Sequence, residues 1–286
     1  MIGFLNVYKP QNMSSAAVVG KIKKQFNLKK VGHMGTLDPL ACGILPIAIG
    51  KATRMFDYFL NKSKQYIVEC EFGYETPSLD LGTEPNLTTN NIPNEDDIKN
   101  TCDLFIGKIS QLPPIYSAKN VNGEKAYDLA RSGKAVELNP VTVEIINFKC
   151  LGCVGINKYR FLIECSSGTY VRSLIRDLAY KLNSLATVTF LERSESGVFN
   201  KDNSVSLNDL LNSNLDNHIL SVQDVFCNIK TFDIDDNEFF RLKNGLTVNT
   251  ELKDETNIFI VYKAELLGVA EVYDGNIKLK TYLLED

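Results

Sequence analysis

The segment GHMGTLDPLACGILPIAIGKATR, residues 32–54, combines glycine, proline and one carboxylate in a pattern that could support catalysis. Pro39 directly follows Asp38, and the basic residues Lys51 and Arg54 end the segment. A residue before proline is pushed towards extended backbone geometry, so we expect Asp38 to lie on a stiff loop. A carboxylate held in this way can approach a bulky ligand and act as a nucleophile or a base. The alternative is an aspartate that only closes a turn of its own backbone.

Other catalytic and metal-binding motifs are incomplete. A run that resembles a phosphate-binding loop has six residues between its two glycines, and Ala52 stands where a Ser or Thr would hold magnesium. Cys150 and Cys153 form a single CxxC without the second pair of a structural zinc site, so we interpret them as strand cysteines. The chain has only 2 histidines. The sequence therefore predicts no metal site and no cofactor.

The composition is that of a globular protein, with 286 residues of which 44% are hydrophobic. No run approaches the roughly 20 apolar residues of a membrane span, and the first residues lack the layout of a signal peptide. An odd number of cysteines, 7, without a secretory signal indicates reduced thiols. We therefore expect a cytoplasmic protein with no membrane association.

The net charge of −4 hides an uneven distribution. Residues 1–64 carry +8, residues 65–200 carry −4 and residues 201–286 carry −8. The total argues against a uniformly basic protein that binds any polyanion. Within the basic part, lysines 21, 23 and 24 belong to a run of five lysines without an acidic neighbour. Such a run is either a solvated helix face or a surface for an anionic ligand.

Hydrophobic periodicity predicts the elements that would hold the loop of Asp38. A strand over residues 2–7 precedes a helix that Ser14 or Ser15 can cap, with Val18 and Ile22 on its apolar side. Segment 65–74 alternates between two faces, which predicts a half-buried strand with Tyr66, Val68, Cys70 and Phe72 on one face. Further strands are predicted at 47–50, 142–150, 158–165, 186–192, 258–262, 266–273 and 276–283, and helices at 51–59, 98–106 and 170–182.

The segment 32–54 resembles the catalytic-loop signature of the TruB family of tRNA pseudouridine-55 synthases. Five more blocks resemble the same family in the same order: FLNVYKP (4–10), KQYIVECEFG (64–73), QLPPIYSAKNVNGEKAYDLARSG (111–133), SSGTYVRSLIRDLA (166–179) and FLERSESG (190–197). The resemblance spans residues 3 to about 200. The tail from about residue 232 resembles the small PUA-like module of bacterial members.

The resemblance implies isomerisation of uridine 55 in the T-loop of tRNA, with no metal or cofactor. It implies an α+β fold: a synthase core over residues 1–228, with a mixed, largely antiparallel sheet and flanking helices, and a small β-rich PUA-like domain over residues 229–286. The partner is the T-arm of tRNA, which must extrude its uridine to expose the glycosidic bond. We expect no obligate protein partner and a monomer. The alternative is a non-catalytic RNA-binding or tRNA-folding protein that retains the synthase cleft.

The resemblance also assigns residues. Asp38 is the catalytic carboxylate, Arg172 pairs with it and Tyr66 stacks on the target base, although an alternating strand also predicts Tyr66 in the core. His33 helps to displace the base from its stack. The other substrate-binding positions are Lys9, Tyr170 and Leu191, and candidates for the RNA backbone are Lys21, Lys23, Lys24, Lys51 and Arg54.

The sequence departs from the family pattern at several positions. Tyr8 stands in place of an Asp, Asn12 in place of a Gly and Pro77 in place of an Asp. Glu192 and Ser194 replace the usual Arg and Thr after the pocket leucine. Glu192 reverses a charge in a region expected near RNA, which places phosphate contacts there in question. No departure falls on the positions that match the catalytic carboxylate, its arginine or the stacking tyrosine.

Overall fold

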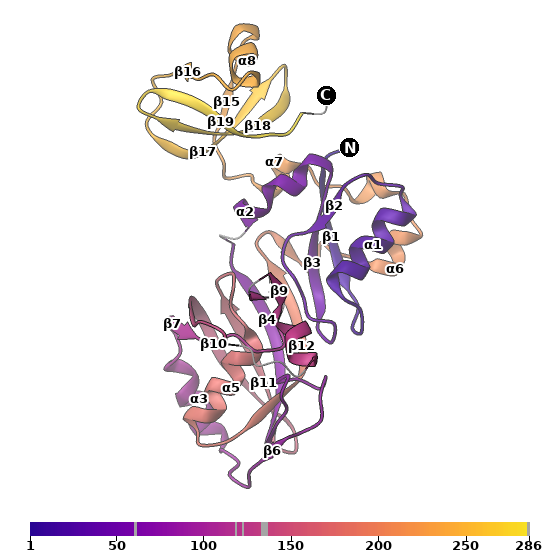
Figure 1. The fold of residues 1–286 in the computed structure, drawn as a ribbon, viewed down its shortest axis with the longest axis vertical. Coiled ribbons are helices and arrows are strands. Elements are labelled where there is room, and N and C mark those ends of the chain that lie inside the picture. Colours follow the sequence, from indigo (N-terminus) through magenta and orange to yellow (C-terminus); the bar gives the residue numbers. More distant parts are fainter. Residues whose placement is uncertain (60–61, 118, 122, 133–136, 285–286) are drawn as a thin grey trace.

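The computed structural model describes residues 1–59, 62–117, 119–121, 123–132 and 137–284, and its strands form one large mixed sheet and a smaller second sheet (Figure 1). The large sheet contains β1 (Gly3–Lys9), β2 (Val31–His33), β3 (Cys42–Ile49), β4 (Lys64–Phe72), β7 (Gly107–Gln111), β10 (Val141–Gly155), β11 (Lys158–Cys165), β12 (Ala186–Ser196), β13 (Phe199–Asn200) and β14 (Val205–Ser206). The second sheet contains β15 (Thr231–Asp233), β16 (Val248–Asn249), β17 (Glu255–Tyr262), β18 (Glu265–Tyr273) and β19 (Asn276–Tyr282).

Two short ribbons and the helices complete the described elements. The ribbons pair β5 (Tyr74–Glu75) with β6 (Leu87–Thr88) and β8 (Asn120–Val121) with β9 (Glu124–Lys125). The helices are α1 (Ser15–Gln25), the 3₁₀ helix η1 (Gly50–Met55), α2 (Phe56–Phe59), α3 (Glu95–Asp103), α4 (Ala126–Arg131), α5 (Val171–Lys181), α6 (Leu207–Leu211), the 3₁₀ helix η2 (Leu215–His218), α7 (Val222–Val225) and α8 (Asp236–Lys243).

Strand β12 joins the two halves of the large sheet, whose order is β14-β1-β3-β12-β4-β11-β10-β7. It pairs with β4 in antiparallel fashion over most of its length, but with β3 in parallel only through Glu192 and Arg193. Helices α1 and α6 lie beside the β1–β3 half, and α3 and α5 pack on the β10–β12 half (Figure 1). Most pairs in the large sheet are antiparallel, which confirms the predicted α+β fold with a mixed sheet.

Local sequence patterns account for the elements nearest the site. The Ser14 hydroxyl accepts a hydrogen bond from the backbone N–H of Ala17 and so caps α1, whose Val18 and Ile22 are fully buried. On β4, Tyr66, Val68, Cys70 and Phe72 are all buried, as their alternation predicts. Cys150 and Cys153 both lie on β10 as free thiols, which confirms their interpretation as strand cysteines.

Two sequence predictions were wrong. The strand predicted at 47–50 begins at Cys42. Residues 43–49 of β3 pair with β1, from Gly3 opposite Ile49 to Lys9 opposite Gly43, and Cys42 pairs with Glu192 of β12. This pairing outweighs the turn tendency of the glycine and proline within the segment. The helix predicted over 98–106 ends at Asp103, so Ile106 lies beyond it and is 46% exposed.

The second sheet shares an apolar cluster with the large sheet. Phe226, in the connection after α7, contacts the ring of Phe4 on β1 and the ring of Phe259 on β17, with centroids 5.9 and 6.5 Å apart. Phe59 and Phe199 belong to the same cluster. The second sheet begins at Thr231, close to the boundary that we propose between residues 228 and 229. Its five strands agree with the β-rich description of this part, which also contains the unpredicted helix α8.

Lys51 and Arg54, two candidates for contact with the RNA backbone, also contact the C-terminal end of the second sheet. The Lys51 ammonium donates to the carbonyl of Leu284 and lies over the ring of Tyr282, 4.7 Å from its centroid. Arg54 donates to the Tyr282 carbonyl at 2.8 Å. Within the described ranges, no helix is both long and apolar enough to cross a membrane.

Replacing Phe259 with alanine tests whether the two sheets unfold together. Phe259 is 1% exposed, so we expect Phe259→Ala to lower the free energy of unfolding by about 3–5 kcal/mol. The change is measured by urea denaturation followed by circular dichroism, and one cooperative transition is expected. Tyr273→Ala, at a side chain 73% exposed on β18, is the control and should change it by less than about 0.5 kcal/mol. Two separate transitions, with only one shifted, would contradict a shared core.

Candidate active site

Asp38 lies on the loop between β2 and β3, and two side chains from other elements fix this loop. The Ser15 hydroxyl, at the start of α1, donates to the Leu37 carbonyl at 3.0 Å and accepts from the Leu37 N–H at 2.9 Å. The Lys9 ammonium, at the end of β1, donates to the carbonyl of Pro39 at 3.3 Å. Both residues flanking Asp38 are therefore held, and Asp38 lies on a constrained loop as predicted.

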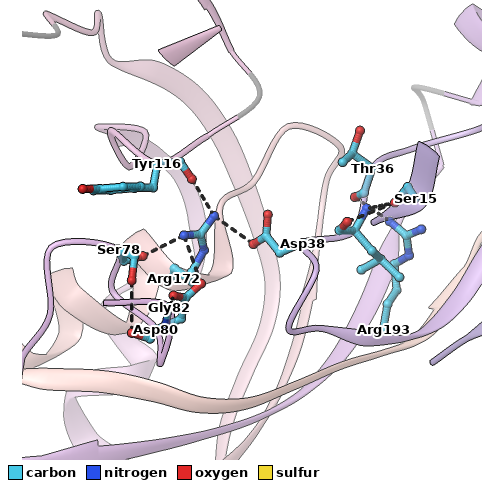
Figure 2. A network of polar contacts seen from close by, with 10 residues as sticks. Ser15, Thr36, Asp38, Ser78, Asp80, Gly82, Tyr116, Arg172 and Arg193 are labelled. Carbon is cyan, nitrogen blue, oxygen red and sulfur yellow. Dashed lines mark hydrogen bonds and ion pairs between the residues drawn. The ribbon is translucent and has the colours of Figure 1, made fainter. Parts of the chain in front are cut away.

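Arg193 on β12, a strand in the interior of the large sheet, supports the same loop (Figure 2). Its side chain is only 1% exposed and donates to three backbone carbonyls: Ile44 at 2.7 Å, Gly35 at 3.1 Å and Thr36 at 3.4 Å. A buried guanidinium needs acceptors for its N–H groups, and here they are supplied by the loop and by β3. This cation therefore ties the loop of Asp38 to the central strand.

Arg172 forms the centre of the polar network around Asp38 (Figure 2). It is the second residue of α5 and is 5% exposed. Its Nη2 lies 2.8 Å from Oδ2 of Asp38 and donates to the Tyr116 carbonyl at 3.0 Å. Its Nη1 donates to the Ser78 carbonyl at 2.7 Å and lies 3.2 Å from Oδ2 of Asp80. One guanidinium thus joins two carboxylates and two carbonyls from three separate segments.

Asp38 is surrounded by a second carboxylate, Asp80, and by the cations Arg172 and Lys9. Two carboxylates share the Arg172 guanidinium, and the Asp38 side chain is 35% exposed. Burial raises the pKa of the Asp38 carboxyl and the neighbouring Asp80 raises it further, whereas Arg172 and Lys9 lower it. The pKa therefore lies above the ordinary value for aspartate. Such a carboxylate is a stronger base than a free aspartate and is still aimed by its arginine.

Two cavities meet at Asp38 and Arg172, and Leu191 also lines both. The smaller has a volume of about 220 Å³ and the larger about 390 Å³. Tyr66 and Tyr170 line the larger one, and burial raises the pKa of Tyr66 to about 12, so its phenol stays neutral. The core position and the cavity-lining position of Tyr66 therefore coexist, since its side chain is 7% exposed.

The other predicted site residues are distributed more widely. Lys9 is fully buried, and besides Pro39 it donates to the carbonyls of Pro10 at 2.9 Å and Met13 at 2.6 Å. Burial lowers the pKa of Lys9 to about 8. His33 lies on β2 and lines neither cavity, and burial lowers its pKa. Lys21, Lys23 and Lys24 lie exposed on α1, away from the cavities.

Sequence reasoning missed Asp80, Ser15 and Arg193. Asp80 follows a turn closed by the Leu79 N–H and the Thr76 carbonyl, 2.9 Å apart, with Pro77 at the position where a turn favours proline. Arg172 could have indicated a further acceptor such as Asp80, because a buried guanidinium requires several hydrogen-bond acceptors. Ser15 was singled out only as one of two possible caps of α1, and no local pattern identified Arg193.

Two departures from the family pattern have structural partners. The Tyr8 hydroxyl donates to Oε1 of Glu192 at 2.6 Å, and Lys201 lies 3.2 Å from the same oxygen. The carboxylate of Glu192 is thus paired within the protein, with 13% of its side chain exposed. Asn12 has a φ of 62°, a left-handed conformation that asparagine tolerates better than most residues and that glycine also adopts.

Comparisons with known proteins agree with this geometry. The model of the TruB family pseudouridylate synthase N-terminal domain matches residues 23–171. The tRNA pseudouridine synthase B of Rickettsia akari (strain Hartford) is 38% identical over 275 residues, or 94% of each chain. That of Clostridium novyi (strain NT) is 42% identical over 227 residues, which cover 78% of this chain and 77% of the relative.

A search of solved structures gives the same fold. A Cbf5-Nop10-Gar1 complex contains a chain that matches with a TM-score of 0.73 at 24% identity, over 98% of this chain and 84% of that one. A chain of an H/ACA RNP bound to a substrate RNA matches with a TM-score of 0.72 at 22% identity, over 99% and 85%. Given the family-model match and the relatives that cover nearly the whole chain, this protein belongs to the TruB family of pseudouridylate synthases.

Proposed function

We propose that this protein converts uridine 55 in the T-loop of tRNA to pseudouridine, with Asp38 as the catalytic carboxylate. The observation that carries the proposal is the Asp38–Arg172 ion pair at the point where two cavities meet. The relatives of this protein bear the name tRNA pseudouridine synthase B, which supports tRNA as the substrate. We further propose that the enzyme acts in the cytoplasm as a monomer.

Access to the glycosidic bond requires that the uridine leave its stack. Extruding a base costs roughly a few kcal/mol, which contacts in the protein must offset. The larger cavity offers Tyr66 for stacking and Leu191 for apolar contact, next to the carboxylate. We assign Tyr170 to the wall of this cavity, which it lines. His33 lies on β2 outside both cavities, and its role in displacing the base rests on the family resemblance.

The reaction moves one bond and one proton within the uridine. The C1′–N1 bond breaks, the uracil turns, a C1′–C5 bond forms, and the proton on C5 is lost while N1 gains one. Asp38 assists the first step as a nucleophile or as a base. Arg172 keeps the carboxylate aimed, and Lys9 fixes the loop through carbonyls rather than through the substrate. In this proposal the larger cavity retains the freed base, which allows it to rejoin the sugar.

Substitution of Asp38 tests the catalytic assignment. Asp38→Asn retains the shape of the side chain but removes its charge, so kcat should fall by about 10²- to 10⁴-fold, while T-arm RNA still binds. Site mapping of pseudouridine in tRNA after incubation with each variant measures the effect. A wild-type protein that binds tRNA but forms no pseudouridine would instead support the non-catalytic alternative, and an active Asp38→Asn variant would refute the role of Asp38.

The shared arginine makes the reaction sensitive to pH. Because the pKa of Asp38 is raised, the ionised form and with it the activity should disappear as the pH falls through that pKa. Asp80→Asn removes a charge that raises this pKa and leaves Arg172 to Asp38, so the acidic limb of kcat/KM should move to lower pH. Asp96→Asn, at an exposed position on α3, should leave the profile unchanged. A shift to higher pH in Asp80→Asn would contradict this electrostatic account.

The basic face of α1 is tested by salt dependence. Replacing Lys21, Lys23 and Lys24 with glutamine should weaken tRNA binding and make log Kd less dependent on log salt. Each lost phosphate contact should lower the slope by about 0.7–0.9. Binding titrations at several salt concentrations measure this slope. An unchanged slope would mean that these exposed lysines form only a solvated helix face.

A further inference from the structure

The larger cavity contains cationic groups that the proposed chemistry does not use. The smaller cavity has Arg172 as its cation together with Asp80, whereas the larger one also includes Lys64, Lys119 and Arg193. The Arg193 guanidinium already donates to the carbonyls of Gly35 in the loop and Ile44 on β3. Lys119 donates to the Asn139 carbonyl at 3.1 Å. The larger cavity thus contains more cationic side chains than are needed to neutralise Asp38.

Lys64 stands out among these cations. It begins β4, two residues before Tyr66, and its ammonium donates to the Ser167 hydroxyl at 2.5 Å. In the part of the chain that the structure describes, Lys64 has no carboxylate within salt-bridge distance. Burial and the nearby Arg193 lower the pKa of Lys64 to about 8. A partly buried ammonium without a counter-ion gains from any anion that enters the cavity.

The position of Lys64 places this charge beside the catalytic loop. A β-carbon added to Gly35 would lie 3.7 Å from Cε of Lys64 and 3.6 Å from Nη1 of Arg193. Gly35 precedes Asp38 by three residues, so their Cα atoms are at most about 11 Å apart. This span is comparable to the size of one nucleotide. An anion at Lys64 could therefore belong to the nucleotide whose base lies at Asp38 or to its neighbour.

The turn before α5 adds hydrogen-bond donors to the same wall. Ser167, Gly168 and Thr169 line the larger cavity, and Gly168 has a φ of +84° with open space where a β-carbon would be. Across the described ranges, the backbone N–H groups of Ser167 and Gly168 have no hydrogen-bond acceptor. Successive free N–H groups in a turn with a left-handed residue are a known anion-binding arrangement. Lysine, hydroxyl and amide donors therefore come from two separate segments.

We propose that Lys64, Ser167 and the turn at Gly168 form a binding site for one backbone phosphate of the RNA, next to the uridine that enters the cavity. This inference rests on the proposed function. The phosphate supplies the counter-ion that Lys64 lacks and accepts hydrogen bonds from the turn. The Ser167 hydroxyl, which donates to the Lys62 carbonyl at 3.3 Å, turns from that carbonyl to the phosphate when the RNA binds. It fixes the nucleotide at its backbone, so that the cavity can hold the base while the glycosidic bond is open.

A double-mutant cycle that combines protein variants with chemically modified RNAs tests the site. The protein variants are Lys64→Met, which keeps much of the apolar stem, and Lys64→Arg, which keeps the charge. The RNAs are T-arm stem-loops with a neutral methylphosphonate at the phosphate either 5′ or 3′ of the target uridine. We expect Lys64→Met to weaken binding of the unmodified RNA by about 10- to 100-fold, and Lys64→Arg to recover most of the loss. Lys149→Met, at an exposed position on β10, is the control.

The decisive result is non-additivity. In the wild-type protein, the methylphosphonate at one of the two positions should weaken binding about as much as Lys64→Met does, and in Lys64→Met it should have no further effect. Additive losses at both positions, or a Lys64→Met variant that binds like Lys149→Met, would overturn the phosphate site. A wild-type protein that forms no pseudouridine in tRNA would overturn the proposed function instead. Thermal denaturation of each variant verifies that it is folded.

Discussion

The guanidinium of Arg172 is the group on which the rest of the site depends. It is nearly buried, so each of its N–H groups requires an acceptor, and the acceptors come from segments far apart in the chain. Asp38 arrives from the loop between β2 and β3, Asp80 and Ser78 from the turn after β5, and Tyr116 from the loop after β7. Satisfying one cation therefore fixes the relative positions of three loops and of the candidate catalytic carboxylate.

Buried cations that donate hydrogen bonds to loop residues also surround the rest of the loop of Asp38. Lys9 and Arg193 are both almost completely buried and donate to backbone carbonyls. A buried cation costs free energy unless its donors are paired, so these contacts resist displacement of the loop. The loop thus gains rigidity from charged side chains on strands β1 and β12. A rigid loop agrees with the proposed role of Asp38, since an aimed carboxylate loses little entropy when the substrate arrives.

The fold distributes the charged residues of the basic N-terminal part among the interior, the second sheet and the surface. The basic N-terminal part contributes Lys9 to the interior, Lys51 and Arg54 to contacts with the second sheet, and the exposed lysines of α1 to the surface. The cations nearest the larger cavity, Lys64 and Arg193, come from β4 and β12. Glu192, whose charge appeared unfavourable for RNA, is bonded to Tyr8. The sequence total of −4 therefore says little about the potential at the cavity.

Where neighbouring residues determine the structure, the sequence alone was sufficient. Proline after Asp38 stiffens the loop, Ser14 caps α1, and alternation on β4 buries Tyr66, because each effect acts within a few residues. The family and its candidate residues were also identified from the sequence. Tertiary structure decided the early start of β3, which pairing with β1 imposes, and the partnership of Asp80 with Arg172. It also decided the inward direction of Arg193, since β12 is bulged on both sides of this residue and its alternation cannot be read from the sequence. A shift of one residue in a strand exchanges its two faces, and only the completed sheet determines which face is buried.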